Sequence, residues 1–164
     1  MGCANSTHDM HDPTTIAPGQ ATWHQQVVID GLRQRQATTL DRTLDLSGRG
    51  LNKTSSARIV ASVIAADNRV RELRLHNNSF DAECALVIAD ALQQNDTITS
   101  LSLASNRLGG PGVAKLMEGL CKRTGHLSSL CLDANNIGAG GAKRVAALVE
   151  NFPALCTLRC APIV

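Results

Sequence analysis

The sequence predicts an α/β solenoid, in which short parallel strands alternate with helices along the chain. First, the pattern Leu-x-Leu-x-x-Asn-x-apolar occurs with small variations at Leu44, Leu73, Leu101 and Leu130, and a fifth copy starts at Leu158. Second, the copies follow one another every 28 or 29 residues. Third, apolar residues recur at intervals of three and four between the copies, as on the buried side of a helix. One such unit cannot bury its apolar face alone, whereas stacked units bury it together.

Each copy is expected to begin with a strand, because its two leucines are one residue apart and therefore share a face. We expect these side chains to point toward the helices, with the strands side by side on a concave sheet. The inward pairs are Leu44 with Leu46, Leu73 with Leu75, Leu101 with Leu103, Leu130 with Leu132, and Leu158 with Cys160.

The polar position of the pattern is expected to hold successive coils together. An asparagine side chain there can bond backbone groups that the turn leaves unpaired. Asparagine occupies it as Asn78, Asn106 and Asn135, whereas Arg49 replaces it in the first copy and Ile163 in the fifth.

Helices are expected between the strands. Asp81 and Pro111 suit a helix cap or a first turn, while the nearby glycines are expected in the turn before the helix. These glycines are Gly109, Gly110, Gly112, Gly138, Gly140 and Gly141. The inward residues of the four helices are expected to be Ile59 and Val63; Leu86, Ile88 and Leu92; Val113, Leu116 and Leu120; and Val145, Leu148 and Val149.

Residues 101–116 in particular resemble a leucine-rich repeat of the ribonuclease-inhibitor subfamily, which also occurs in NOD-like receptors and Ran GTPase-activating proteins. The alternating spacing of 28 and 29 residues is similar to that subfamily, and the resemblance covers residues 44–164. It implies a horseshoe segment with strands on the concave side and helices on the convex side. The first copy departs from the pattern, as terminal repeats do.

The preceding residues divide into two parts. Residues 22–43 are expected to form a capping helix, Trp23–Arg35, and its lead-in, because Val27, Val28 and Leu32 would shield the end of the stack. Residues 1–21 hold too little apolar surface to fold and are expected to form a flexible tether.

The start of the chain fits a lipidation signal. Removal of Met1 would expose Gly2 for myristoylation, with Ser6 at the favoured hydroxyl position. A single myristoyl chain binds membrane weakly, so Cys3 is expected to be palmitoylated as the second anchor. We therefore expect the protein on the cytoplasmic face of a membrane, such as the plasma or ciliary membrane.

Other function classes find little support. A net charge of +2 without a clustered basic surface argues against nucleic acid binding. No apolar run approaches the ~18 residues of a membrane span, and no phosphate loop, nucleophile elbow or zinc-protease motif occurs. We expect no enzymatic activity, no cofactor and no metal site. A zinc site at Cys131, Cys156 and Cys160 is less favoured than packing, because its ligands would have to leave adjacent coils.

Free cysteines are expected in a reducing compartment. We expect most of them to fill small apolar spaces in or beside the core, namely Cys84, Cys121, Cys156 and Cys160.

The outward residues of the strands form the candidate binding surface. Interfaces draw much of their energy from Trp, Tyr and Arg, and only Arg74 and Arg159 provide such anchors on this face. The candidate binding residues are Asp45, Glu72, Arg74, His76, Asp133 and Arg159. We expect a protein partner. A small-GTPase regulator, by analogy with the longer Ran GTPase-activating proteins, and a structural component of a cytoskeletal or ciliary assembly remain alternatives.

A second candidate surface is the C-terminal edge, formed by Leu158, Cys160 and Ile163. An uncovered strand edge is a template for another chain. We expect either a second copy of the protein or a partner to bind there; a truncated sequence is the alternative explanation of an uncapped end.

Overall fold

The computed structural model describes residues 23–36, 42–122, 127–150 and 155–161, and in these ranges helices and strands alternate. The helices are α1 (Trp23–Gln36), α2 (Thr54–Ala66), α3 (Ala82–Gln93), α4 (Gly109–Cys121) and α5 (Gly138–Val149). The strands are β1 (Thr43–Asp45), β2 (Glu72–Arg74), β3 (Ser100–Ser102), β4 (Ser129–Cys131) and β5 (Thr157–Arg159).

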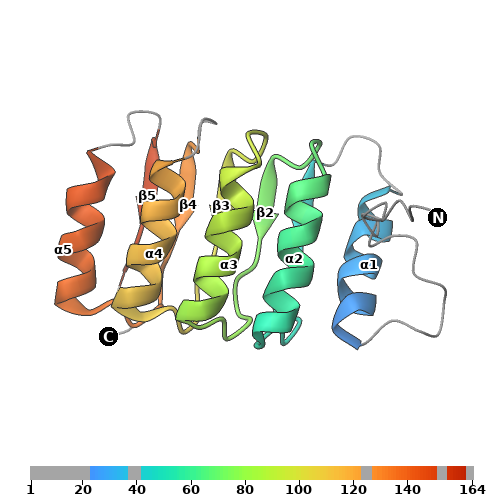
Figure 1. Cartoon of the computed structure of the whole chain (residues 1–164), viewed down its shortest axis with the longest axis horizontal. Helices are drawn as coiled ribbons and strands as arrows, with labels where there is room; N and C mark the ends of the chain where they lie inside the picture. The colour runs from blue at the N-terminus through green and yellow to red at the C-terminus, as the bar shows by residue number, and fades with distance from the viewer. Residues whose placement is uncertain (1–22, 37–41, 123–126, 151–154, 162–164) are drawn as a thin grey trace, which may run out of the picture.

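The strands form one parallel sheet in chain order, and the helices form a second layer on one side of it (Figure 1). The register aligns the repeats position by position, so that Leu44, Leu73, Leu101, Leu130 and Leu158 lie in one row across the sheet. The expected α/β solenoid, with its strand and helix layers, is confirmed.

The core lies between the two layers and is almost entirely aliphatic. The paired strand leucines from Leu44 to Leu132 are each at most 1% exposed, and Phe80 is fully buried among them. The last pair differs, since Leu158 is only half-buried and Cys160 is exposed. Cys160 does lie on the helix side of β5, where it lines a pocket with Ile137 and Ala142, but it is not buried because no coil among the described residues follows β5 to cover it.

The asparagines of the repeat join neighbouring coils, as expected. Asn78, Asn106 and Asn135 are buried. The side-chain amide of Asn106 donates to the carbonyls of Leu103 in its own coil and Leu75 in the preceding one, at 2.8 and 3.1 Å. Its oxygen accepts from the backbone N–H groups of Asn78 and Phe80. Each asparagine thus satisfies buried groups of two coils at once.

A second recurring feature is a left-handed residue in the loop that follows each of the first four strands. Gly48, Asn77, Ser105 and Ala134 occupy equivalent places, with φ between 53° and 64°. Only the first of these is a glycine, the residue that adopts this conformation without steric cost.

Of the glycines expected in turns, Gly109 and Gly138 begin α4 and α5 with the positive φ of a turn residue, at 61° and 65°. The others lie inside the first turns of these helices, which corrects that expectation, and for two of them the reason is the close approach of the neighbouring helix. A Cβ atom on Gly110 would lie 2.9 Å from the carbonyl oxygen of Ile137, and one on Gly141 would lie 2.8 Å from the Cα atom of Gly110. At these two positions the helices are therefore too close for larger residues.

Helix α1 covers one end of the stack. It extends over the expected helix and packs against α2 and β1. Val28 and Ile29 are buried, and Gly31 allows the helix to approach the side chains of Leu44 and Leu46. Trp23, at the start of the helix, is 60% exposed.

Candidate functional site

The strand face is the side of the sheet that the helices leave uncovered. Three rows of side chains cross it, because the register aligns residues of equal position in each repeat. The central row consists of Asp45, Arg74, Ser102, Cys131 and Arg159. These side chains range from half-buried to exposed, so they are available at the surface of the sheet.

A first charged group lies over β1 and β2. The Nε of Arg74 binds Oε1 of Glu72 at 2.7 Å, and its Nη1 lies 3.8 Å from Oδ2 of Asp45. The hydroxyl of Ser47 hydrogen-bonds Nδ1 of His76 at 2.8 Å. Four of the six predicted binding residues therefore gather in one polar group that fixes the Arg74 side chain.

The electrostatics of this group favour the ionised form of Asp45. Partial burial acts to raise the pKa of Asp45, but hydrogen bonds from Ser47 and the nearby Arg74 and His76 outweigh it. The pKa of Asp45 consequently falls below its ordinary value, so this carboxylate stays charged where it faces Arg74.

A second charged group lies over β4 and β5. The Nε of Arg159 binds Oδ2 of Asp133 at 2.9 Å, and Oδ1 of Asp133 accepts from the backbone N–H of Ala161 at 2.7 Å. The thiol of Cys131 lies 3.5 Å from the same carboxylate. Asp133 thus orients the second arginine and also anchors the strand after Arg159.

The strip between the two groups is uncharged. Ser100 and Ser102 of β3 and Ala104 just after it occupy the three rows, and all are half-buried small residues. The sequence identified the six charged or titratable residues, but it did not reveal their division into two groups with a neutral centre. Alignment of the repeats would have indicated this division, because the repeat of β3 contributes only small uncharged side chains to the strand face.

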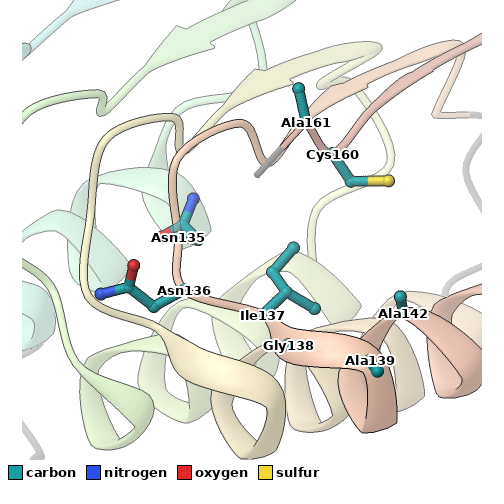
Figure 2. A pocket seen from close by; sticks show the side chains of 8 residues that line it. All are labelled: Asn135, Asn136, Ile137, Gly138, Ala139, Ala142, Cys160 and Ala161. Atoms are coloured by element: carbon teal, nitrogen blue, oxygen red, sulfur yellow. The ribbon is translucent and has the colours of Figure 1, made fainter. Parts of the chain in front are cut away.

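The C-terminal edge contains a pocket of about 490 Å³ between the end of β5 and the start of α5 (Figure 2). In Figure 2 the Ile137 side chain points into the space between Cys160 and α5. The pocket is lined by Asn135, Asn136, Ile137, Gly138, Ala139, Ala142, Cys160 and Ala161. Two of the three residues predicted for this edge, Leu158 and Cys160, are described; Ile163 lies outside the described residues.

The remaining predicted sites have separate outcomes. Gly2 and Cys3 lie outside the described residues. Cys84 is buried as expected, but Cys121 and Cys156, like Cys160, are exposed, so apolar packing does not explain them.

In the described part of the chain, no three His, Cys, Asp or Glu residues gather as metal ligands. None of the described helices has the length and apolarity needed to cross a bilayer.

Comparison with known proteins gives relatives of the same kind of architecture. No protein-family model matches the sequence. Tonsoku-like protein from Bos taurus is 32% identical over 129 residues, which are 77% of this chain and 8% of that protein. Ribonuclease inhibitor from Sus scrofa is 28% identical over 118 residues, or 72% of this chain and 26% of that protein. The chain therefore spans only a small part of these relatives.

A solved structure described as the actin-binding site 2 of leiomodin-1 has a TM-score of 0.70 and covers 85% of this chain and 80% of that one. The sequences are 20% identical, so this likeness shows the fold alone.

Proposed function

Because the chain is a leucine-rich repeat protein related in sequence to ribonuclease inhibitor and to a part of Tonsoku-like protein, we propose that it is a non-catalytic adaptor whose strand face binds a protein partner. The names of ribonuclease inhibitor and of the leiomodin-1 actin-binding site both describe proteins that act on other proteins. That agreement supports protein binding as the general role.

The observation that carries the proposal is the fixed placement of two arginines on an otherwise small polar face. Arg74 is held by Glu72, and Arg159 is held by Asp133. Ordering a long side chain on binding costs about 0.5–1.5 kcal/mol, and here the carboxylates order both side chains before the partner arrives. Arginine is also enriched among the residues that dominate interface energies.

The chemistry of this face favours a partner that offers hydrogen-bond acceptors at two separated points. A guanidinium group has five N–H donors, and the carboxylates engage only part of each set. Carbonyl or carboxylate groups of the partner would meet Arg74 at one end and Arg159 at the other. The neutral strip on β3 would allow the backbone of the partner to pass between them.

A double variant, Arg74→Ala with Arg159→Ala, tests this role. The matched control is Lys115→Ala with Lys122→Ala, which removes the same charge from exposed positions of α4 and its C-terminal cap. Proteins retained from cell extract by the immobilised full chain are identified by quantitative mass spectrometry, and a retained partner is then purified for calorimetry. The strand-face variant should weaken binding by at least tenfold, and the helix-face control should not. Equal binding by all three proteins would refute the proposal.

We further propose that the adaptor is tethered to the cytoplasmic face of a membrane through Gly2 and Cys3. The support is the sequence motif itself, because a second acyl chain would supply the affinity that one myristoyl chain lacks.

Incorporation of an alkyne analogue of myristate provides the test. Label on the natural sequence and none on Gly2→Ala is expected, while Cys3→Ser should keep the label and shift part of the protein to the cytosolic fraction. Absence of label from the natural sequence would rule the tether out and leave the strand-face proposal untouched.

A further inference from the structure

The two charged groups of the strand face differ in the sign of the charge that they expose. At β1 and β2, the side chains of Asp45 and Glu72 are 51% and 37% exposed, and that of Arg74, which contacts both, is 43% exposed. Two accessible carboxylates therefore share one accessible guanidinium. Within the three rows, and with His76 neutral, this part of the face carries a net negative charge.

At β4 and β5 the exposed charge is positive. The side chain of Asp133 is only 18% exposed, whereas that of Arg159, which it binds, is 69% exposed. Both oxygens of Asp133 are engaged, one by Nε of Arg159 and the other by the backbone N–H of Ala161. Among the described residues no other group binds this guanidinium, so its Nη nitrogens can bind a partner.

The carboxylate of Asp45 can accept a hydrogen bond from a further cation. Its Oδ1 accepts the backbone N–H of Ser47 at 2.9 Å, but its Oδ2 lies 3.8 Å from Nη1 of Arg74, which is too far for a hydrogen bond. Partial burial acts to raise the pKa of Asp45, yet its neighbours lower it below the ordinary value. Asp45 is therefore ionised at neutral pH and still accessible.

Asp45 and Arg159 lie in the same row of the sheet, four strand spacings apart. Neighbouring strands are ~4.8 Å apart, so the two positions are separated by about 19 Å. An extended peptide advances ~3.3 Å per residue, and residues an even number apart point to the same side. Two side chains six residues apart in such a peptide are thus about 20 Å apart on one side, which matches the row.

We propose that the strand face binds an extended segment of its protein partner that runs across the strands, with a lysine or arginine at Asp45 and an aspartate or glutamate at Arg159, six residues apart. This inference rests on the adaptor role proposed above and specifies the partner.

The chemistry at each end supports this choice of partner. A carboxylate can take two parallel hydrogen bonds from the guanidinium of Arg159, and a segment with like charges at both ends would meet repulsion at one of them. The uncharged residues of the segment pass over Ser102 and its small neighbours. Because a segment with the opposite order of charges can bind in the opposite direction, the face recognises the spacing rather than the order.

Selection of peptides by the immobilised full chain tests the proposal. The probe is a phage-displayed library of random twelve-residue peptides. Peptides with a cationic and an acidic residue six positions apart should be enriched at least tenfold over peptides with such a pair five or seven positions apart, whose two side chains point to opposite sides. Equal enrichment at the three spacings, or no enrichment of such pairs, would overturn the proposal.

Charge reversal at each end locates the binding. Asp45→Lys and Arg159→Glu should each weaken the best selected peptide at least tenfold in calorimetry, with the folds verified by circular dichroism. The matched controls Asp90→Lys and Lys122→Glu make the same changes of charge at exposed positions of α3 and of the C-terminal cap of α4, and should leave the affinity unchanged. Replacing the acidic residue of the peptide with lysine should restore binding to Arg159→Glu. Affinity that survives both reversals, or that this exchange does not restore, would contradict the proposal.

A partner purified from cell extract separates this inference from the adaptor role. If Arg74→Ala with Arg159→Ala loses the partner while Asp45→Lys keeps it, the adaptor role stands and the proposed segment is wrong. Loss of the partner in both supports both proposals.

Sedimentation of the natural sequence tests the remaining occupant, a second copy of the chain. A monomer at high concentration agrees with a partner segment. A dimer that Arg159→Glu dissociates would show that a second copy occupies the strand face and would overturn the assignment.

Discussion

The side-chain oxygen of Asn106 lies 3.0 Å from both the Asn78 and the Phe80 backbone nitrogens, although Asn78 precedes it by 28 residues. One buried amide thus fixes the distance and the register between two coils. The same side chain donates to carbonyls of both coils, so its removal would leave polar groups of two repeats without partners.

Replacement of this asparagine should be strongly destabilising. In Asn106→Ala two buried N–H groups lose their acceptor, at about 1–3 kcal/mol each, so a loss of ~2–6 kcal/mol is expected in urea unfolding. Asn135→Ala should cost less, because Asn135 accepts from Leu108 at a longer distance of 3.4 Å. Asn52→Ala, at an exposed position, serves as the control and should stay within about 0.5 kcal/mol. Similar losses of stability in all three variants would argue against this role of the asparagine hydrogen bonds between coils.

Two glycines on neighbouring helices should respond to alanine in opposite directions. A Cβ atom on Gly119 would lie 2.6 Å from that of Ala89, across the contact between α3 and α4, whereas one on Gly140 would meet nothing within 4 Å. Gly119→Ala should therefore cost ~1–3 kcal/mol through overpacking. Gly140→Ala should gain about 0.5–1 kcal/mol, since glycine pays more backbone entropy in a helix. Thermal unfolding of both variants measures this, and a stable Gly119 variant would mean that the helices can separate at little cost.

The left-handed loop positions 134 and 48 are equivalent in the repeat, so exchanging alanine and glycine at both tests for backbone strain. Ala134 has φ of 57° and Gly48 has φ of 64°. A non-glycine residue in this region costs about 1–2 kcal/mol, partly offset by the chain entropy of glycine. Ala134→Gly should therefore raise the free energy of unfolding by ~0.5–1 kcal/mol, and Gly48→Ala should lower it by about 1 kcal/mol. If both substitutions changed the free energy of unfolding in the same direction, backbone strain at this position would be refuted.

Asp81 should make stability depend on pH at the start of α3. Its carboxylate accepts from the backbone N–H groups of Cys84 and Glu83 at 2.9 and 3.1 Å, and the bond to Cys84 is the main reason why the pKa of Asp81 falls below 3.8. A lowered pKa adds stability that is present above the unfolded-state pKa and is lost as pH falls through the folded-state pKa. Asp81→Ala should cost ~1 kcal/mol at pH 7, and this difference from the natural sequence should shrink below about pH 4. A constant difference down to pH 2 would exclude a role for the charge.

The cysteines should differ sharply in reactivity. Burial raises the pKa of the Cys84 thiol to about 11, while Cys156 and Cys160 are exposed. Because the thiolate is the nucleophile, iodoacetamide at pH 7.5 should modify Cys156 and Cys160 in the folded protein and leave Cys84 intact, as read by peptide mass spectrometry. Addition of urea should make Cys84 reactive, which controls for the reagent. Early modification of Cys84 would indicate that α3 opens readily.

The repeat register was predictable because it follows from a spacing of 28 or 29 residues that recurs along the sequence. The row of first leucines proposed from the spacing is a row of the sheet, from Leu44 with Leu73 to Leu130 with Leu158. The phase of single helices was less predictable. Ile59 was expected to point inward, yet it is half-buried, while Ser56 is fully buried in the same helix. A buried serine does not show in an apolar pattern, so periodicity placed the inner side of α2 slightly off.

The candidate sites were predictable as residues but not as arrangements. Arg74 and Arg159 follow from their positions between inward leucines, but the carboxylates that hold them depend on side-chain geometry across strands. The pocket at the C-terminal edge arises from the stacking of β5 and α5, which no single repeat encodes. Gly110 and Gly141 were misplaced because the sequence signal of a glycine is the same for a turn and for two helices in backbone contact.

Trp23 is the single tryptophan of the chain, which has no tyrosine, and it is the first residue of α1. Intrinsic fluorescence therefore reports on the capping helix and on its contact with the first repeat, where the Trp23 ring lies beside Gly50, whereas circular dichroism averages over all the repeats. In a linear array, neighbouring units are coupled only through their shared interfaces. Any gap between the two unfolding curves would consequently measure how tightly α1 is coupled to the rest of the stack, without the need for an added probe.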